Sequence, residues 1–252
     1  MRIFSFYLAC WFCSLLFSPG CTTVPSPPPP ELGDSEREAK LRLQSIQAAE
    51  ETIEREILRL DELVLSFQAQ RELLLETDLP LARLRLVSMN CLNTEYGDGL
   101  STVIGLEGTP ISCRPEHLQT LQDSLAEYSV TSRDQALQFL YIIDQVRILR
   151  GALRQRLTRL PETIADHQDF IVEERANLRR IEADLARRRS LYSSADWADV
   201  MTLIGTQRVL LREFEGQLDQ LAELYPQWPA ILEEKVALVY FELSELQAAE
   251  SW

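Results

Sequence analysis

The residues of this chain that could do chemistry are few and widely spaced. His117 and His167 are the only histidines, and neither has a cysteine or a second histidine at the spacing of a zinc site. The sequence contains no nucleophile elbow, phosphate-binding loop or dinucleotide fingerprint. Many of the 39 carboxylates stand beside arginines, as in Glu173, Glu174 and Arg175, a pattern typical of solvent-facing ion pairs. We therefore predict no catalytic residue, metal or cofactor, and a protein that is not an enzyme.

Arginine is the charged residue that gathers in runs. The chain has 23 arginines and only 2 lysines, and codon usage in a GC-rich genome is a sufficient explanation of that ratio. Two runs fall in the later parts of expected helices, where cations complement the helix dipole. The alternative is contact with an anionic partner, such as lipid headgroups, lipopolysaccharide or an acidic protein face, and Arg187, Arg188 and Arg189 are the candidates for it. The runs are Arg147, Arg150, Arg154, Arg156 and Arg159, and then Arg175, Arg179, Arg180 and Arg187 to Arg189.

The N-terminal 20 residues have the pattern of an export signal. Arg2 supplies a positive charge, residues 3–17 are apolar or small, and Gly20 precedes Cys21. The apolar run has 15 residues and is shorter than the about 20 that a transmembrane helix needs. Residues 1–20 are therefore predicted to be a signal peptide.

Gly20-Cys21, followed by Thr22-Thr23 and VPSPPPP, resembles the lipobox of bacterial lipoproteins. The resemblance implies that Cys21 is acylated, becomes the first residue of the mature protein and anchors it in a membrane facing the periplasm. The chain departs from the family pattern at Ser18, where Leu is usual, and at Pro19. Thr22 in place of Asp is similar to lipoproteins sorted to the outer membrane, which favours the outer over the inner membrane.

Residues 21–33 contain five prolines and are predicted to form an extended, polyproline-like tether. Such a segment either holds the body away from the bilayer or simply links the two parts. No function is assigned to Cys10 and Cys13, because their C-x-x-C spacing lies inside the apolar signal.

Cys91 and Cys113 are the pair that remains once Cys21 is assigned to the lipid. An even pair in an exported chain favours a disulfide, here closing an irregular loop over residues 90–114. The loop is either a recognition surface on a rigid scaffold or a helix connection stabilised against proteases. Asn93, Glu95 and Asp98 offer oxygen atoms, but their spacing is not that of a calcium-binding EF-hand, and we expect a solvated acidic loop.

Residues 34–252 are predicted to be all-α, because apolar residues recur at alternating spacings of three and four. We call these positions the apolar seam. The first helix runs from a cap at Asp34 or Ser35 to about Leu74. Further seams begin after Pro80, after Pro115, after a cap at Thr131 or Ser132, after Pro161, at Trp197 and after Pro229. The helix after Pro161 is more polar than the others, and we expect it to be partly exposed to solvent.

Short connections between these helices predict an elongated bundle of antiparallel, coiled-coil-like hairpins. We expect a boundary or kink at Pro161, a turn at residues 192–194 and a reversal of the chain at residues 226–229. Residues 100–106, after Asp98-Gly99, are the one strand-like stretch and could form a small hairpin.

A formal net charge of −14 argues against nucleic-acid binding through the overall field. The leading hypothesis is a membrane-tethered periplasmic scaffold or adaptor that binds another cell-envelope protein. The alternatives are a regulator of a cell-wall enzyme, and a helical lipoprotein that binds a lipid or another small ligand. The pattern leaves open whether the seams close within one chain or between chains.

Overall fold

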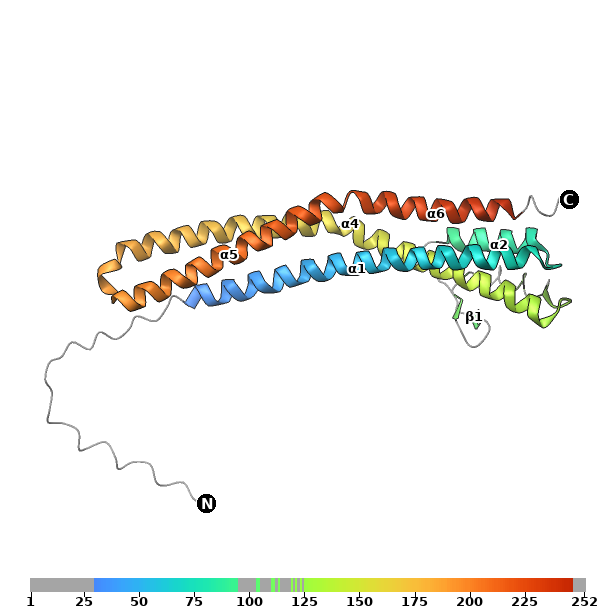
Figure 1. Cartoon of the computed structure of the whole chain (residues 1–252), viewed down its shortest axis with the longest axis horizontal. Helices are drawn as coiled ribbons and strands as arrows, with labels where there is room; N and C mark the ends of the chain where they lie inside the picture. Colours follow the sequence, from blue (N-terminus) through green and yellow to red (C-terminus); the bar gives the residue numbers. More distant parts are fainter. Residues whose placement is uncertain are drawn as a thin grey trace, which may run out of the picture.

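Figure 1 shows a computed structural model of the chain as an elongated bundle of long helices. The structure describes residues 30–94, 103–104, 110–111, 113, 119, 121, 123 and 125–246. The predicted all-α class is confirmed, together with the elongated antiparallel arrangement and one disulfide-closed loop. The predicted signal peptide and Cys21 lie outside the described residues.

Three long rods make up the bundle. Its helices are α1 (Pro30–Leu75), α2 (Leu81–Asn93), α4 (Val130–Arg187), α5 (Ser194–Leu224) and α6 (Gln227–Glu245). The rods are α1, α4 and the successive pair α5 and α6, while the short α2 packs beside α4 and α6. A 3₁₀ turn, Arg189–Leu191, links α4 to α5.

The contacts between helices give their directions. Ser35, Arg42 and Phe67 of α1 meet Glu174, His167 and Phe139 of α4, in opposite order along the two chains. Asp61 and Arg71 of α1 meet Lys235 and Glu242 of α6 in the same order. Hence α4 is antiparallel to α1, and α6 is parallel to it.

The apolar seam of each rod forms one continuous core. In α1 its buried members include Ile46, Leu60 and Phe67, and the rings of Phe67 and Phe139 lie 5.1 Å apart between α1 and α4. Burying a leucine or phenylalanine side chain contributes roughly 1.5–3 kcal/mol, so the seams dominate the stability of the fold. The helical segment after Pro161 is partly exposed, as predicted: Glu174 and Ile181 of its seam are half-buried. The other seam residues are buried: Ile164, His167, Ile171, Leu178 and Leu185.

The first helix begins earlier than predicted. Pro30 opens α1, so the last four residues of the predicted tether, 30–33, are helical. Proline is tolerated in a first turn because the amide it lacks has no partner there, and buried Leu32 fixes this turn to the core. Ser35 therefore lies inside the helix and caps nothing.

Pro161 does not end a helix. α4 runs through it for 58 residues, although proline in a helix interior costs about 3 kcal/mol. Pro161 itself is exposed, while the neighbouring Leu157, Leu160 and Ile164 are buried. Packing of this uninterrupted seam outweighs the lost hydrogen bond.

The expected reversal at residues 226–229 is also wrong. Tyr225 and Pro226 keep right-handed helical dihedral angles, and α6 starts at the next residue. Buried Leu221, Trp228 and Leu232 continue the same seam across the junction. Because burial favours this continuation, α5 and α6 extend end to end in Figure 1.

Several smaller predictions can be checked. The turn at residues 192–194 is confirmed, with Ser193 capping α5, whereas the cap of α4 is Ser129 and not Thr131 or Ser132. The start of the helix expected after Pro115 lies outside the described residues. Val103 and Ile104 (β1) pair antiparallel with Pro110 and Ile111 (β2), so the predicted hairpin forms with a later partner than Asp98-Gly99 implied.

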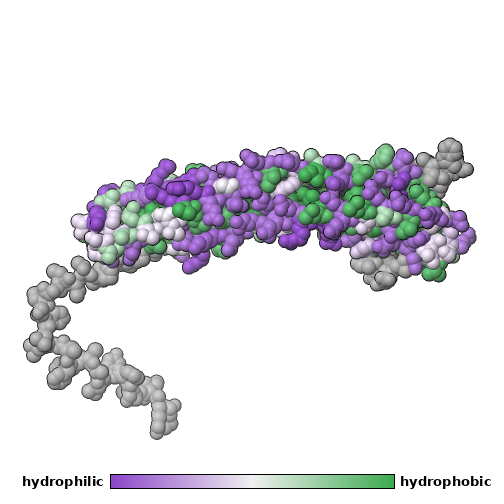
Figure 2. All heavy atoms as spheres, viewed as in Figure 1, coloured by the Kyte–Doolittle hydropathy of each residue, from purple (hydrophilic) through white to green (hydrophobic). Residues whose placement is uncertain are grey.

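The visible surface is mainly hydrophilic. Figure 2 shows separate apolar patches, several of them over the half of the bundle that holds α6. Exposed apolar side chains on that half include Leu65, Leu73, Leu86 and Phe241. These side chains form apolar surface outside the core that is exposed to solvent.

Candidate functional site

The end of α2 is fixed by the predicted disulfide. Cys91, in the last turn of α2, is bonded to Cys113, two residues after β2, and both are fully buried. The Asp144 carboxylate of α4 lies beside the two sulfur atoms. Sulfur atoms that are bonded to each other provide no thiolate, so this group is not a metal site. The bond joins the end of α2 to the residue two positions after β2, inside the core. We call the end of the bundle that holds α2 and this disulfide the stapled end.

A buried ion pair lies directly behind the disulfide. Arg147 donates to one oxygen of Asp144 from Nε at 3.1 Å and from Nη2 at 2.7 Å, and the side chains are 2% and 0% exposed. Two charges buried together give up solvation that their attraction only partly returns, whereas removing one of them costs about 3–5 kcal/mol. The ion pair therefore adds little net stability, but loss of either charge would destabilise this part of the fold.

A pocket of about 340 Å³ opens beside this ion pair. It has an apolar and amide wall from the end of α2 and a basic wall from α4. Its lining is Leu92, Asn93, Thr94, Arg147, Arg150, Gly151 and Arg154. This size lies at the lower end of the range of about 300–1,000 Å³ for small-molecule sites.

Side chains of α6 bond to three residues of the pocket lining. The Tyr240 hydroxyl donates to Asn93 Oδ1 at 2.5 Å and accepts from Arg150 Nη1 at 3.3 Å. Arg154 donates to Glu233 at 2.6 Å on the exposed surface. The pocket thus lies beside contacts that join α2, α4 and α6. Of the loop residues considered for calcium, Asn93 is used by Tyr240, while Glu95 and Asp98 lie outside the described residues.

The prediction that the first arginine run lies near the end of a helix is wrong. α4 continues to Arg187, so residues 147–159 are in its middle and gain nothing from its dipole. Their partners come from other elements or from within α4: Asp144 for Arg147, Tyr240 for Arg150, Glu233 for Arg154 and Glu56 for Arg156. The run therefore joins neighbouring helices.

Arg187, Arg188 and Arg189 lie at the turn between α4 and α5. Arg187 and Arg188 both pair with Asp184. The Arg189 guanidinium lies 4.6 Å from the centre of the Trp197 ring. Each therefore has a local partner, and the three do not converge on one point.

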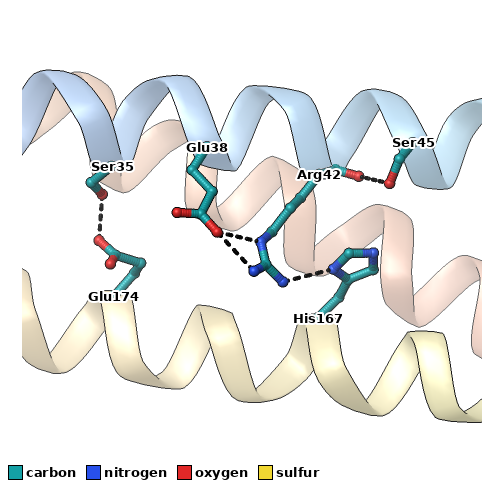
Figure 3. A network of polar contacts seen from close by, with 6 residues as sticks. All are labelled: Ser35, Glu38, Arg42, Ser45, His167 and Glu174. Atoms are coloured by element: carbon teal, nitrogen blue, oxygen red, sulfur yellow. Dashed lines mark hydrogen bonds and ion pairs between the residues drawn. The ribbon is translucent and has the colours of Figure 1, made fainter.

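Figure 3 shows a polar layer between α1 and α4 in the other half of the bundle. Arg42 donates to Glu38 at 2.7 and 2.9 Å and to His167 Nδ1 at 3.4 Å, and its guanidinium lies 4.3 Å from the centre of the Phe170 ring. Because arginine can only donate, the histidine ring must accept at Nδ1. Burial, and then the positive charge of Arg42, lower the pKa of His167 below its ordinary value, so the ring is neutral at pH 7.

The second part of this layer is separate from the histidine. Ser35 donates to Glu174 and accepts from Gln207 Nε2 of α5 at 2.8 Å. His167 points to Arg42 and Ser35 to Glu174 (Figure 3), so the layer does not form a serine–histidine pair. Its contacts join α1, α4 and α5 across the core.

Sequence reasoning did not single out Tyr240, Asp144 or Gln207. Tyr240 and Asp144 adjoin seam positions, and Gln207 lies at a seam position between Ile204 and Leu211. A polar residue at or beside a seam position is the available signal that a buried partner exists.

No protein-family model matches this sequence, and the searches of curated proteins and of solved structures also gave no match. Within the described residues, no helix is long and apolar enough to cross a membrane.

Proposed function

We propose that this protein is a membrane-tethered periplasmic scaffold or adaptor that binds another cell-envelope protein through the stapled end of its bundle. The tether is the lipobox-like segment at Cys21, and the binding surface is the pocket around Asn93 and Tyr240. The observation that supports the proposal is that the pocket and the disulfide lie at the opposite end of the helical body from the first turns of α1.

Chain geometry limits where a lipid on Cys21 could lie. Eight residues lie between Cys21 and Pro30, the first residue of α1, and the nine steps along the chain span at most about 30 Å. The first turns of α1 lie opposite Glu174 of α4. An acylated Cys21 would therefore keep this end of the bundle near the bilayer.

The disulfide lies far from that end. Thirty residues of helix separate Asp144, which adjoins the disulfide, from Glu174, a distance of about 45 Å at 1.5 Å per residue. The body would therefore present the pocket well beyond the headgroups. Arginine lines the pocket, and the tyrosine Tyr240 bonds to two of the lining residues. Both residue types are enriched at protein interfaces.

The test is crosslinking in living cells followed by purification of the tagged full-length chain from solubilised membranes. A photoreactive residue replaces exposed Asn93 in one version and exposed Arg55, on α1, in the matched control. We expect one stoichiometric envelope protein to be captured through position 93 and not through position 55. Mass spectrometry of the mature N-terminus tests acylation of Cys21 in the same preparation.

Cys21→Ser is the control for the tether. Loss of the partner in Cys21→Ser, with the fold unchanged by circular dichroism, supports the tethered adaptor. A chain that purifies alone from both versions rejects the adaptor. Capture that persists in Cys21→Ser rejects the need for the tether.

A further inference from the structure

A second pocket lies between α4 and α5, near the start of α1. It encloses about 310 Å³, and four of its six lining residues are arginines. We call it the arginine groove, and its residues are Arg175, Leu178, Arg179, Arg208, Leu211 and Arg212. Leu178 and Leu211 are buried and close its floor, while the arginines form its walls. The groove is thus a small basic depression with an apolar base.

Two of the four guanidinium groups are already neutralised. Arg175 makes two parallel hydrogen bonds to Glu215, at 2.6 and 2.5 Å, and Arg208 donates to Glu182 at 2.6 Å. The hydrogen bonds between Arg175 and Glu215 lower the pKa of that carboxyl, so Glu215 keeps its charge.

The other two arginines have no such partner. Within the described part of the chain, no carboxylate forms an ion pair with Arg179 or Arg212, which stand four residues after Arg175 and Arg208. The groove therefore carries two positive charges that its neighbouring carboxylates do not neutralise.

The positive charge of the groove is local. Residues 175–212 contain eight arginines against four carboxylates, but the flanking Glu173, Glu174, Glu213 and Glu215 bring residues 173–215 to a net charge of zero. Attraction of an anion therefore depends on the guanidinium groups in the groove and not on the net charge of this end of the bundle.

Exposed valines flank the groove on both helices. Val172 precedes Arg175 by three residues on α4, and Val209 precedes Arg212 by three on α5, with exposed fractions of 65% and 60%. Residues three apart are neighbours on a helix surface, so each wall places an apolar side chain beside a guanidinium. A ligand that fits both is an anion attached to an apolar body.

We propose that the arginine groove binds the phosphate group of an anionic membrane lipid, with Arg179 and Arg212 as its main ligands. Planar guanidinium groups match phosphate oxygens in pairs, and the small volume admits a headgroup rather than a folded domain. The lipid source rests on the proposed function, since a tether at Cys21 would bring this end to the bilayer, whereas the phosphate chemistry does not.

Arginine-selective modification by phenylglyoxal, followed by peptide mass spectrometry, tests the proposal on the full chain in neutral detergent micelles. The micelles contain phosphatidylglycerol, phosphatidylcholine, or no lipid with inorganic phosphate added. We expect phosphatidylglycerol to protect Arg179 and Arg212 and to leave the exposed Arg55 reactive. Phosphatidylcholine, whose headgroup has no net charge, should protect neither.

Two double variants separate a site from general charge attraction. Arg179→Gln with Arg212→Gln should lower the affinity for phosphatidylglycerol by at least roughly ten-fold, since hydrogen bonds to charged groups are lost. Arg187→Gln with Arg188→Gln removes the same charge from the same end but leaves the groove intact, and should change the affinity much less.

The outcomes distinguish the two proposals. An equal loss of affinity in both double variants, or equal protection of Arg55, overturns the groove. Protection by inorganic phosphate as strong as by phosphatidylglycerol overturns the lipid as its source and assigns the groove to a soluble phosphate. If mass spectrometry finds no lipid on Cys21 of the wild-type chain, and phosphatidylglycerol still protects Arg179 and Arg212, the groove is supported as a lipid site and the tether is rejected.

Discussion

Removing the Cys91–Cys113 disulfide should destabilise the body by about 3 kcal/mol. The two residues are 22 apart in the sequence, and the chain-entropy model for a loop of this length gives about 3 kcal/mol at 25 °C. The variant is Cys91→Ala with Cys113→Ala, which leaves neither member of the pair as an unpaired thiol. For a body of about 200 residues, this loss corresponds to a fall in Tm of about 6–12 °C.

The assay is urea unfolding followed by circular dichroism at 222 nm, on the full chain in neutral detergent. Wild-type protein that is unfolded, reduced and refolded in reductant is the matched control and should show the same loss. Folded wild-type protein should resist the reductant, because both sulfur-bearing residues are fully buried. A loss below about 1 kcal/mol would show that packing on α4, and not the bond, holds the end of α2.

Three further predictions concern the core, its histidine and its proline. Phe139→Ala should cost about 3–5 kcal/mol in urea unfolding, whereas Leu58→Ala, 64% exposed, should change stability by less than about 0.5 kcal/mol; similar values would place Phe139 outside the core. Because burial lowers the pKa of His167, the unfolded chain binds more protons below its ordinary pKa of 6.5, so stability should fall as the pH drops from 6.5 through the lowered pKa. His167→Gln should weaken this pH dependence of Tm, and an unchanged profile in His167→Gln would refute the assignment. Pro161→Ala should raise stability by about 1–3 kcal/mol, since it restores an amide donor inside α4, and a loss of stability would mean that the helix needs the proline.

The sequence determined the fold class because the apolar seam has one period throughout. Positions spaced three and four apart, such as Ile46, Leu60 and Phe67, are buried as predicted. The disulfide was also predictable, since Cys91 and Cys113 were the one pair left in a chain expected to be exported. The helical period can be seen in residues that are close together in the sequence, and the cysteine pair follows from the number of cysteines. Both predictions therefore hold in the tertiary structure.

The boundary allowed at Pro161 and the reversal predicted at residues 226–229 do not occur, for one physical reason. Pro161 and Pro226 each remove a backbone hydrogen bond, but the seam keeps its spacing across both of them. The energy of packing that seam against two neighbouring rods is not visible in a local pattern, and it exceeds the cost of the proline. The sequence therefore determined which residues are buried, while the tertiary structure decided how many rods they form.

The candidate sites belong almost wholly to the tertiary structure. Nothing in the sequence placed Tyr240 beside Asn93, 147 residues away, or set Arg212 of α5 in one groove with Arg179 of α4. The sequence by itself determined the period of the helices, the cysteine pair and the abundance of arginine. The packing of α4 against α5 decided which of these arginines have a carboxylate partner and which do not. An ion pair depends on distance in space and not on separation along the chain.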